Sequence, residues 1–355
     1  MQGVDKYYGQ NPAFVAPVFE QFGLEETLQF FKELGIYPKE RNGGYYPQSE
    51  QATAIRDVLL MELKKQNVGM VCGCGIRGIE KTAKGFTFHS KGGDFYATKC
   101  IMATGGKTLK KSGSDGSGFL YLESLGHHII DLVPGLIGLK GKQSFFADIA
   151  GIRADVKVDL YIESTHVCSE QGELQLTNYG ISGIPVFQLS RVATRALSEQ
   201  KEVYATLNFV PFWEKEQCLT YFKERFKTAD EKHIGEALIG FFPEKLIPVL
   251  LEESHIKAAK YANRLQTEEL ERFIDTVQGL RVDITDWNTF DTAQVTAGGV
   301  DTDEIDAETM ESKLCPGLYF AGEMVDIDGI CGGYNLQWAW SSGAVAGIHV
   351  ARELS

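Results

Sequence analysis

The chain has 355 residues, of which 43% are hydrophobic and 23% are charged, a composition that supports two or three compact units with cores. Its 48 acidic and 35 basic residues give a formal net charge of −13. This balance argues against nucleic acid as the main partner, because phosphate binding needs a basic face. The longest apolar runs are far too short to span a bilayer, so we expect no membrane partner.

Cysteine usage and the N-terminal composition favour a cytoplasmic location. The seven cysteines are irregularly spaced and include no C-x-x-C pair, which is typical of a reduced protein without disulfides or a zinc site. No basic region followed by an apolar core marks a signal peptide. The adjacent His127 and His128 fit no metal-ligand pattern, and we expect both at the surface. The sequence therefore predicts no metal centre.

The hydrophobic periodicity changes several times along the chain. Apolar residues at helical spacing predict helices over residues 25–34, 53–66, 214–227, 232–241, 243–252, 267–277 and from about 335 to the end. Short alternating or apolar runs predict strands over residues 68–71, 85–90, 94–97, 99–103, 154–163, 203–209, 317–321 and from about 280. In the helix over 53–66, Ile55, Leu59 and Leu63 lie on one apolar face.

This order of elements predicts an α/β fold that is interrupted by an insertion. Residues 1–133 and 290–355 would form one domain. The inserted β-rich substrate domain would contain residues 134–212 and 278–289, and a helical subdomain would follow over residues 213–277. Antiparallel strands with one solvent-exposed face explain why apolar and polar residues alternate regularly inside the insertion.

Two glycine-rich segments resemble phosphate loops. Gly73–Gly78 matches G-x-G-x-x-G, but a phosphate loop requires a helix directly after it, and alternating residues predict a hairpin there instead. We therefore interpret this match as a decoy. Gly113–Gly118 leads into a helix-like run, and it is either an anion-binding loop or a flexible connection capped by Ser117.

A third glycine-rich segment points more sharply to a ligand. A buried strand ends at Gly322 and Glu323, and Gly332-Gly333 then precede an apolar helix. Glu323 stands where it could accept a ribityl or ribose hydroxyl. The N-terminus of the helix would present amide groups to a phosphate or to the carbonyl edge of a flavin. A tightly packed core helix with a glycine-rich entry is the alternative interpretation.

The string FAGEMVDIDGICGGYNLQWAWSSGAVAG over residues 320–347 closely resembles the end of the bacterial HI0933-like flavoproteins. These are also called the BaiN/RdsA or aminoacetone-oxidase-like family of FAD-dependent oxidoreductases. Further matching stretches occur in the family's order over almost the whole chain, at residues 6–12, 103–106, 172–183 and 295–300. The resemblance implies a Rossmann-like, two-dinucleotide-fold FAD domain with inserted domains.

The resemblance also implies roles for individual residues. Glu323, after Gly322, would contact the FAD ribityl chain. The implied backbone contacts to the cofactor come from Ile76 at the adenine, from Thr104, Gly105 and Gly106 in a second turn, and from Gly333, Asn335, Leu336 and Gln337 at the pyrophosphate and flavin. No catalytic acid or base stands out from spacing, so the catalytic residues stay unknown.

Family members begin with a strand, a true G-x-G-x-x-G, a helix and a second strand, and this chain begins after those elements. We therefore expect an incomplete FAD-binding domain, exposed sheet edges and weak or no FAD binding by these 355 residues. The expected activity is transfer of hydride or electrons between FAD and a small organic substrate, with NAD(P)H as the candidate co-substrate. A non-catalytic scaffold fragment or interaction module of the same fold is the alternative. The substrate and the oligomeric state stay open.

Overall fold

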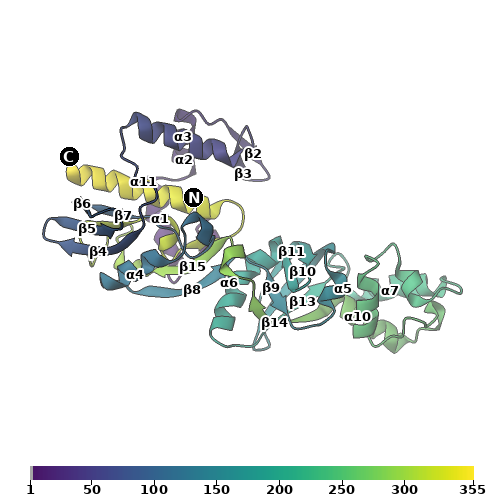
Figure 1. Cartoon of the computed structure of the whole chain (residues 1–355). Helices are drawn as coiled ribbons and strands as arrows, with labels where there is room; N and C mark the ends of the chain where they lie inside the picture. The colour runs from purple at the N-terminus through teal and green to yellow at the C-terminus, as the bar shows by residue number, and fades with distance from the viewer. Residues whose placement is uncertain (1–2) are drawn as a thin grey trace. The chain divides into compact units, whose positions relative to one another are not determined.

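The computed structural model describes residues 3–355, which form two compact units (Figure 1). Unit 1 contains the residues up to Leu132 together with Val295–Ser355, and unit 2 contains Val133–Gln294. The three-part domain division given above stays a prediction. The helices over residues 213–277 share one hydrophobic core with the β-rich part of unit 2, so they are not separate in packing.

Unit 1 is built from several small sheets. Its strands are β1 (Tyr7–Tyr8), β2 (Pro38–Arg41), β3 (Gly44–Pro47), β4 (Ile76–Thr82), β5 (Gly85–Ser90), β6 (Phe95–Ala97), β7 (Cys100–Met102), β15 (Val295–Val300), β16 (Leu318–Phe320) and β17 (Asp328–Gly329). β7 and β16 are parallel neighbours, and β4, β5 and β6 form an antiparallel sheet. β15 pairs with β8 (Ile129–Gly135), the strand along which the chain passes into unit 2.

A long C-terminal helix holds the core of unit 1 together. The helices here are α1 (Val15–Gln21), α2 (Leu24–Glu33), α3 (Ala52–Lys65), α4 (Ser117–Ser124) and α11 (Tyr334–Leu354). Trp338 of α11 is buried against the rings of Phe14 and Phe19, and Trp340 meets Phe31 of α2. Burial of these large rings is the main apolar contribution that fixes α11 against the N-terminal segment.

Unit 2 contains a closed six-stranded barrel. Its strands are β9 (Leu139–Gly141), β10 (Arg153–Ile162), β11 (Thr165–Leu176), β12 (Gly180–Gly183), β13 (Val203–Asn208) and β14 (Leu280–Trp287). They follow the order β10-β11-β12-β9-β14-β13, and every neighbouring pair is antiparallel. Alternate residues such as Val156, Val158 and Leu160 are buried, as the alternating sequence predicts.

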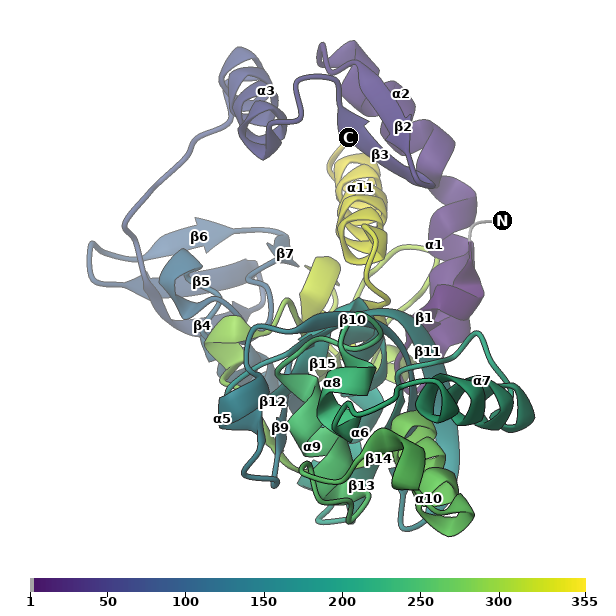
Figure 2. The same cartoon turned by 90° about the vertical axis from the view of Figure 1, so that its right-hand side faces the viewer.

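Helices complete the core of unit 2. They are α5 (Phe146–Ile149), α6 (Ile184–Ser198), α7 (Lys215–Lys227), α8 (Ile234–Leu238), α9 (Leu246–Glu253) and α10 (Thr267–Gly279). In the second view α5 lies on the opposite side of the unit from α7 and α10 (Figure 2). The helix expected over 232–241 shortens to α8, because Ile239 and the positive-φ Gly240 end it. Phe222 and Phe273 link α7 to α10 with ring centroids 5.5 Å apart.

The strand expected over residues 68–71 does not form, which corrects the sequence-based prediction. Residues 68–74 are almost entirely exposed, and no strand of the described residues pairs with them. A β-strand needs a hydrogen-bonding neighbour, so the alternating pattern alone is not sufficient. The neighbouring helix α3 forms as expected but buries none of its side chains, and its apolar Met61 is 62% exposed.

Candidate functional site at the carboxyl ends of β7 and β16

Two turns meet where the parallel strands β7 and β16 end. After β7 the chain turns through Thr104, Gly105 and Gly106, and after β16 it turns through Gly322 and Glu323. The carboxyl ends of parallel strands in open α/β sheets are where ligands bind, because the loops there diverge and leave a crevice. The structure thus brings together five residues predicted separately from two distant stretches of sequence.

Glu323 ties these turns to a third segment. Its carboxylate accepts hydrogen bonds from the amide of Thr296 at 2.5 Å and from the amide of Gly106 at 3.4 Å. The Thr108 hydroxyl lies 3.5 Å from the same carboxylate. Glu323 forms no ion pair among residues 3–355, and its side chain is partly exposed. The acid therefore organises backbone around it while remaining accessible from one side.

Close approach of neighbouring side chains explains the glycines of this site. A Cβ on Gly106 would lie 2.2 Å from the Thr296 hydroxyl and 2.8 Å from the Glu323 carboxylate. A Cβ on Gly118, in the first turn of α4, would lie 2.1 Å from the Thr104 hydroxyl. Side chains at either position would push the turn away from its neighbours. These two glycines are needed for packing within the site.

The N-terminus of α11 is open. Gly332 and Gly333 are exposed, a Cβ on Gly333 would meet no atom within 4 Å, and Leu336 is 57% exposed. Gln337 is the first residue whose amide donates to a helical carbonyl, that of Gly333 at 3.0 Å. The three preceding amides have no acceptor within the helix, so they can bind an electron-rich group. The alternative, a tightly packed core helix with a glycine-rich entry, stays open, because α11 also buries Trp338 and Val345.

Side chains near this helix N-terminus hold the backbone in place. The Asn335 amide both accepts from the Gly329 N–H and donates to the Gly329 carbonyl, each at 2.8 Å. Gln337 donates to the hydroxyl of Thr27 at 2.8 Å. Both side chains are thus occupied by protein, and of the two backbone amides only that of Asn335 lacks an acceptor within the helix and could meet a ligand. The carbonyl of Ile76, the residue expected at the adenine, accepts from Tyr121 at 2.6 Å.

The N-terminal stretch of residues 6–12 pairs with the acidic loop before α11. β1 lies antiparallel to β17, with Tyr7 opposite Gly329. A Cβ on Gly9 would lie 2.1 Å from the Asp326 carbonyl, and the Asp326 carboxylate accepts the amide of Gln10 at 2.8 Å. Burial raises the pKa of Tyr7, whose hydroxyl donates to a backbone carbonyl of α11. The buried acid of this loop is thus engaged in holding the N-terminal segment.

The other two glycine-rich segments do not form phosphate loops. Gly73–Gly78 runs into the β4–β5 hairpin, which confirms that its G-x-G-x-x-G match is a decoy. In the loop over residues 113–118, the Asp115 carboxylate accepts the amide of Ser117 at 2.9 Å and so occupies the N-terminus of α4. Hydrogen bonds from Ser117 lower the pKa of Asp115. The loop therefore carries its own anion at the helix entry.

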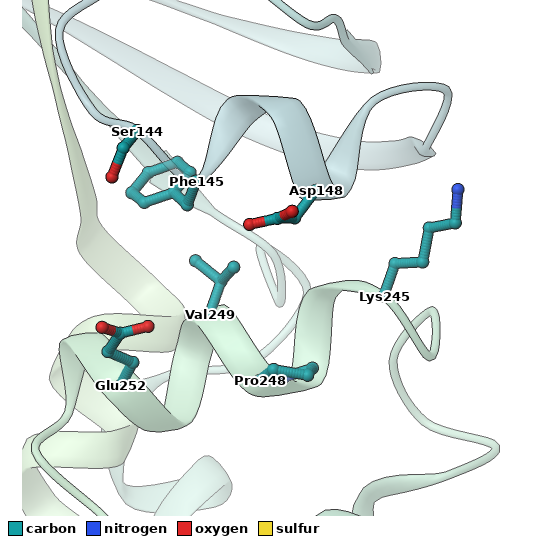
Figure 3. A pocket seen from close by; sticks show the side chains of 7 residues that line it. All are labelled: Ser144, Phe145, Asp148, Lys245, Pro248, Val249 and Glu252. Carbon is teal, nitrogen blue, oxygen red and sulfur yellow. The ribbon is translucent and has the colours of Figure 1, made fainter.

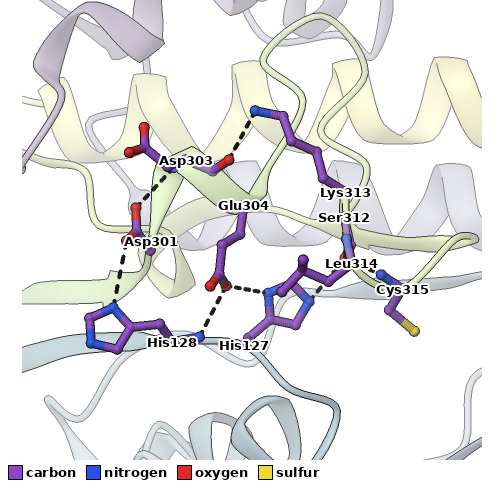
Figure 4. Close-up of polar contacts among 9 residues, drawn as sticks. All are labelled: His127, His128, Asp301, Asp303, Glu304, Ser312, Lys313, Leu314 and Cys315. Carbon is purple, nitrogen blue, oxygen red and sulfur yellow. Dashed lines mark hydrogen bonds and ion pairs between the residues drawn. The ribbon is translucent and has the colours of Figure 1, made fainter.

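His127 is buried, which corrects the expectation that it lies at the surface (Figure 4). Its Nδ1 lies 2.9 Å from the Glu304 carboxylate and its Nε2 lies 2.9 Å from the Ser312 hydroxyl. The ring packs edge-on against Phe320 of β16, with centroids 5.1 Å apart. His128 is exposed as expected. Glu304 and Ser312 are 177 and 185 residues away in sequence, so no local pattern could have identified these contacts.

The Ser312–His127–Glu304 arrangement has the order of a hydrolase triad, but its chemistry is that of a structural clamp. The Ser312 hydroxyl also accepts the amides of Leu314 and Cys315, at 3.1 and 2.7 Å. Ser312 is almost completely buried. A nucleophile must reach its substrate, and this one cannot. The network instead holds β16, and with it the turn that carries Glu323.

Two of the thiols in this unit, those of Cys100 and Cys315, are buried. Burial raises the pKa of the Cys100 thiol to about 12 and also raises that of Cys315, so neither is a reactive thiolate at neutral pH. Among residues 3–355, no group of three or more metal-ligating side chains is found. Within the same range, no helix combines the length and apolar character needed to cross a bilayer.

Unit 2 has a shallow cleft of about 370 Å³ between α9 and the residues around α5 (Figure 3). Its lining residues are Ser144, Phe145, Asp148, Lys245, Pro248, Val249 and Glu252. The three charged side chains are exposed, whereas Phe145 and Val249 belong to the core beneath them. The cleft thus combines exposed charges with core side chains, and no role is assigned to it.

Comparisons with known proteins agree with this geometry. Residues 2–349 match the family model of the HI0933-like protein Rossmann domain. The chain belongs to the HI0933-like family. It is 43% identical over 341 residues to a 3-dehydro-bile acid delta(4,6)-reductase of Clostridium scindens, which covers 96% of this chain and 83% of that protein. It is also similar to two proteins named ribosomal RNA dihydrouridine synthase.

Those two relatives are more distant. The Escherichia coli protein is 28% identical over 336 residues, covering 95% of this chain and 81% of the relative. The Haemophilus influenzae protein is 25% identical over 355 residues, covering 98% and 84%. The matches confirm the predicted family and the enzyme class, an FAD-dependent oxidoreductase with a Rossmann-like α/β fold. The individual site residues, NAD(P)H and the cytoplasmic location stay predictions.

Proposed function

We propose that this protein reduces a carbon–carbon double bond conjugated to a carbonyl in a small organic substrate, using FAD and with NAD(P)H as the electron source. The relatives' names share this chemistry. A 3-dehydro delta(4,6) steroid and a uracil ring each hold a double bond next to a carbonyl, and each product contains two more hydrogen atoms. Over the reaction the substrate gains two electrons and two protons: NAD(P)H supplies a hydride, which carries both electrons and one proton, and the second proton comes from the solvent.

The observation that carries the proposal is the open N-terminus of α11 beside the turn of Glu323. FAD, when bound, supplies the hydride transfer. The residues present fit the flavin half of such a cofactor. The amides of Asn335 and Leu336 have no acceptor within the helix, Leu336 is exposed, and Glu323 is partly exposed where it contacts Gly106. The role of the chain is to bind and orient the ring and to exclude water from it.

We further propose that a strand–helix–strand unit completes the adenine half of the site in the whole protein. The supporting observation is apolar surface that an isolated unit would normally bury. Ile101, in the parallel strand β7, is 40% exposed, α3 has no buried side chain, and Met70 and Val71 are exposed. Binding of FAD to residues 1–355 alone should accordingly be weak.

A chimera tests both statements. The strand–helix–strand unit of a family member is fused to this chain, and flavin content is measured by absorbance after purification. We expect stoichiometric flavin in the chimera, little in the chain alone, and NAD(P)H-dependent conversion of a 3-oxo-delta(4,6) steroid acid to a product heavier by two hydrogens. A folded chimera that stays colourless with added FAD would contradict the flavin assignment.

Variants at the helix N-terminus locate the cofactor within the chimera. Leu336→Glu places a negative charge at the exposed start of α11, where it should repel the cofactor and lower FAD affinity about tenfold or more. Leu336→Gln is the matched neutral control and should retain FAD. Equal affinities of the two variants would show that FAD does not sit at α11.

RNA is the alternative substrate, favoured by the two dihydrouridine synthase names. The same chimera is incubated with ribosomal RNA and NAD(P)H, and dihydrouridine is quantified after nuclease digestion. The net charge of −13 and the 43% identity to the bile acid reductase favour the small molecule. Dihydrouridine formation without steroid reduction would show that the substrate is RNA and not a small molecule.

A further inference from the structure

A cluster of aromatic rings lies at the surface of unit 2, away from any role assigned above. Trp213 is in contact with three other rings, those of Phe212, Tyr221 and Phe241, at centroid distances of 5.1, 4.7 and 5.6 Å. Phe212 is 65% exposed and the other three rings are half-buried. Ile239, the residue directly after α8, is 55% exposed. We call the rings of Phe212, Trp213, Tyr221 and Phe241 the aromatic patch.

Arg225 of α7 fixes a positive charge at the edge of the aromatic patch. Its guanidinium donates to the hydroxyl of Tyr221 at 3.1 Å and to the carbonyls of Ala237 and Ile239 at 2.6 and 3.0 Å. All three acceptors are neutral, and no carboxylate within residues 3–355 forms an ion pair with Arg225. Carbonyl and hydroxyl contacts orient the cation without neutralising it, so its charge remains available to an anion.

The surrounding packing explains why the patch is rigid. Gln278 of α10 donates to the Trp213 carbonyl at 2.9 Å, and Phe222 and Phe242 of the core lie directly beneath Tyr221 and Phe241. Rings held in this way lose little conformational entropy when a ligand covers them. Trp, Tyr and Arg side chains in one rigid cluster are also the residue types that dominate binding hot spots.

We propose that the aromatic patch and Arg225 form a binding site for a flat apolar molecule that carries a carboxylate. The rings cover the apolar body, and the guanidinium donates hydrogen bonds to the anionic group. Charge complementarity selects this occupant, because a neutral apolar ligand would leave the oriented cation unused. The site is independent of the proposed cofactor site, and its test requires neither flavin nor catalysis.

Pyrenebutyrate and its neutral analogue pyrenebutanol are the probes, and energy transfer from Trp213 to pyrene reports binding to the intact chain. Because four tryptophans are present, Trp213→Phe identifies the signal from the patch. We expect pyrenebutyrate to bind about tenfold more tightly than pyrenebutanol, the size expected for one charge-assisted hydrogen bond. Equal affinities of the two probes would overturn the proposal.

Variants separate the two parts of the site. Arg225→Gln should weaken pyrenebutyrate about tenfold and leave pyrenebutanol unchanged, whereas Phe212→Ser should weaken both probes. Lys223→Gln removes an exposed positive charge from the same helix and should change neither affinity more than about twofold. If circular dichroism shows that Arg225→Gln does not fold, the proposal is tested by comparing the two probes on the native chain and on Phe212→Ser.

A single-stranded oligouridylate tests the competing class of ligand, since aromatic rings and arginine also stack on bases. We expect no displacement of pyrenebutyrate by this oligonucleotide at concentrations well above the probe. Displacement that is lost in Arg225→Gln would assign the surface to RNA and overturn the proposed carboxylate ligand.

Discussion

Removal of the Glu323 carboxylate should loosen the turn that follows β7. Thr296 is almost completely buried and its amide donates to Glu323 at 2.5 Å, so Glu323→Ala leaves a buried N–H without an acceptor. Such a group costs about 1–3 kcal/mol. The Gly106 contact at 3.4 Å is longer and contributes less. We therefore expect a local loss of about 2 kcal/mol for Glu323→Ala and about 1 kcal/mol or less for Glu323→Gln, which keeps an acceptor oxygen.

Hydrogen–deuterium exchange followed by mass spectrometry measures this loss where it occurs. The two units need not unfold together, so a global denaturation midpoint would combine the stabilities of both units. Peptides that contain Gly106 and Thr296 should exchange roughly 30-fold faster in Glu323→Ala, which corresponds to about 2 kcal/mol. Glu123→Ala, an exposed acid on α4, serves as control. Unchanged exchange at Thr296 in Glu323→Ala would refute the organising role of this carboxylate.

Three further results are expected. Gly106→Ala should destabilise unit 1 by more than about 2 kcal/mol, measured by hydrogen–deuterium exchange of unit 1 peptides, because its Cβ would collide with Thr296, whereas Gly75→Ala, whose Cβ meets no atom within 4 Å, should be neutral. His127→Leu should cost about 2 kcal/mol in the same assay, since Glu304 and Ser312 each lose one hydrogen bond while Glu304 keeps the His128 amide and Ser312 keeps its two backbone amides. Burial raises the pKa of Tyr7 above its ordinary 10.0, so the native state keeps this proton at a pH where the unfolded chain loses it. The free energy of unfolding should therefore fall above about pH 10, and it should fall less steeply in Tyr7→Phe.

The sequence alone was sufficient to predict the elements that are determined by local hydrophobic periodicity and by glycine positions. The helix from about residue 335 is α11 (Tyr334–Leu354), and the alternating runs at 154–163 and 203–209 are barrel strands. These segments are long and strongly periodic, and each one buries the face that its pattern indicates. The exposed entry of α11 also follows from the Gly332-Gly333 pair, because φ values of 127° and 95° turn the chain before the helix.

Features that depend on distant partners could not be predicted in this way. Residues 68–71 have the alternation of a strand, yet no neighbouring strand among the described residues completes it. Closure of the barrel depends on β9 (Leu139–Gly141), which is too short to produce a periodic signal and pairs with both β12 and β14. His127 becomes a buried clamp only because Glu304 lies beside it after folding. Each case requires a contact that the local sequence does not encode.

The glycines of this chain show why a motif must be interpreted together with its neighbours. Gly73 and Gly75 satisfy a dinucleotide pattern, yet a Cβ on either would point into open space. Gly106 and Gly118 are not part of a G-x-G-x-x-G match, and a Cβ on either would meet a threonine hydroxyl within 2.2 Å. A phosphate loop requires glycine because a backbone must approach a ligand closely, and the same physical need arises where a side chain approaches the backbone. Crowding around Glu323 therefore explains the glycine at position 106, which the dinucleotide pattern alone does not identify.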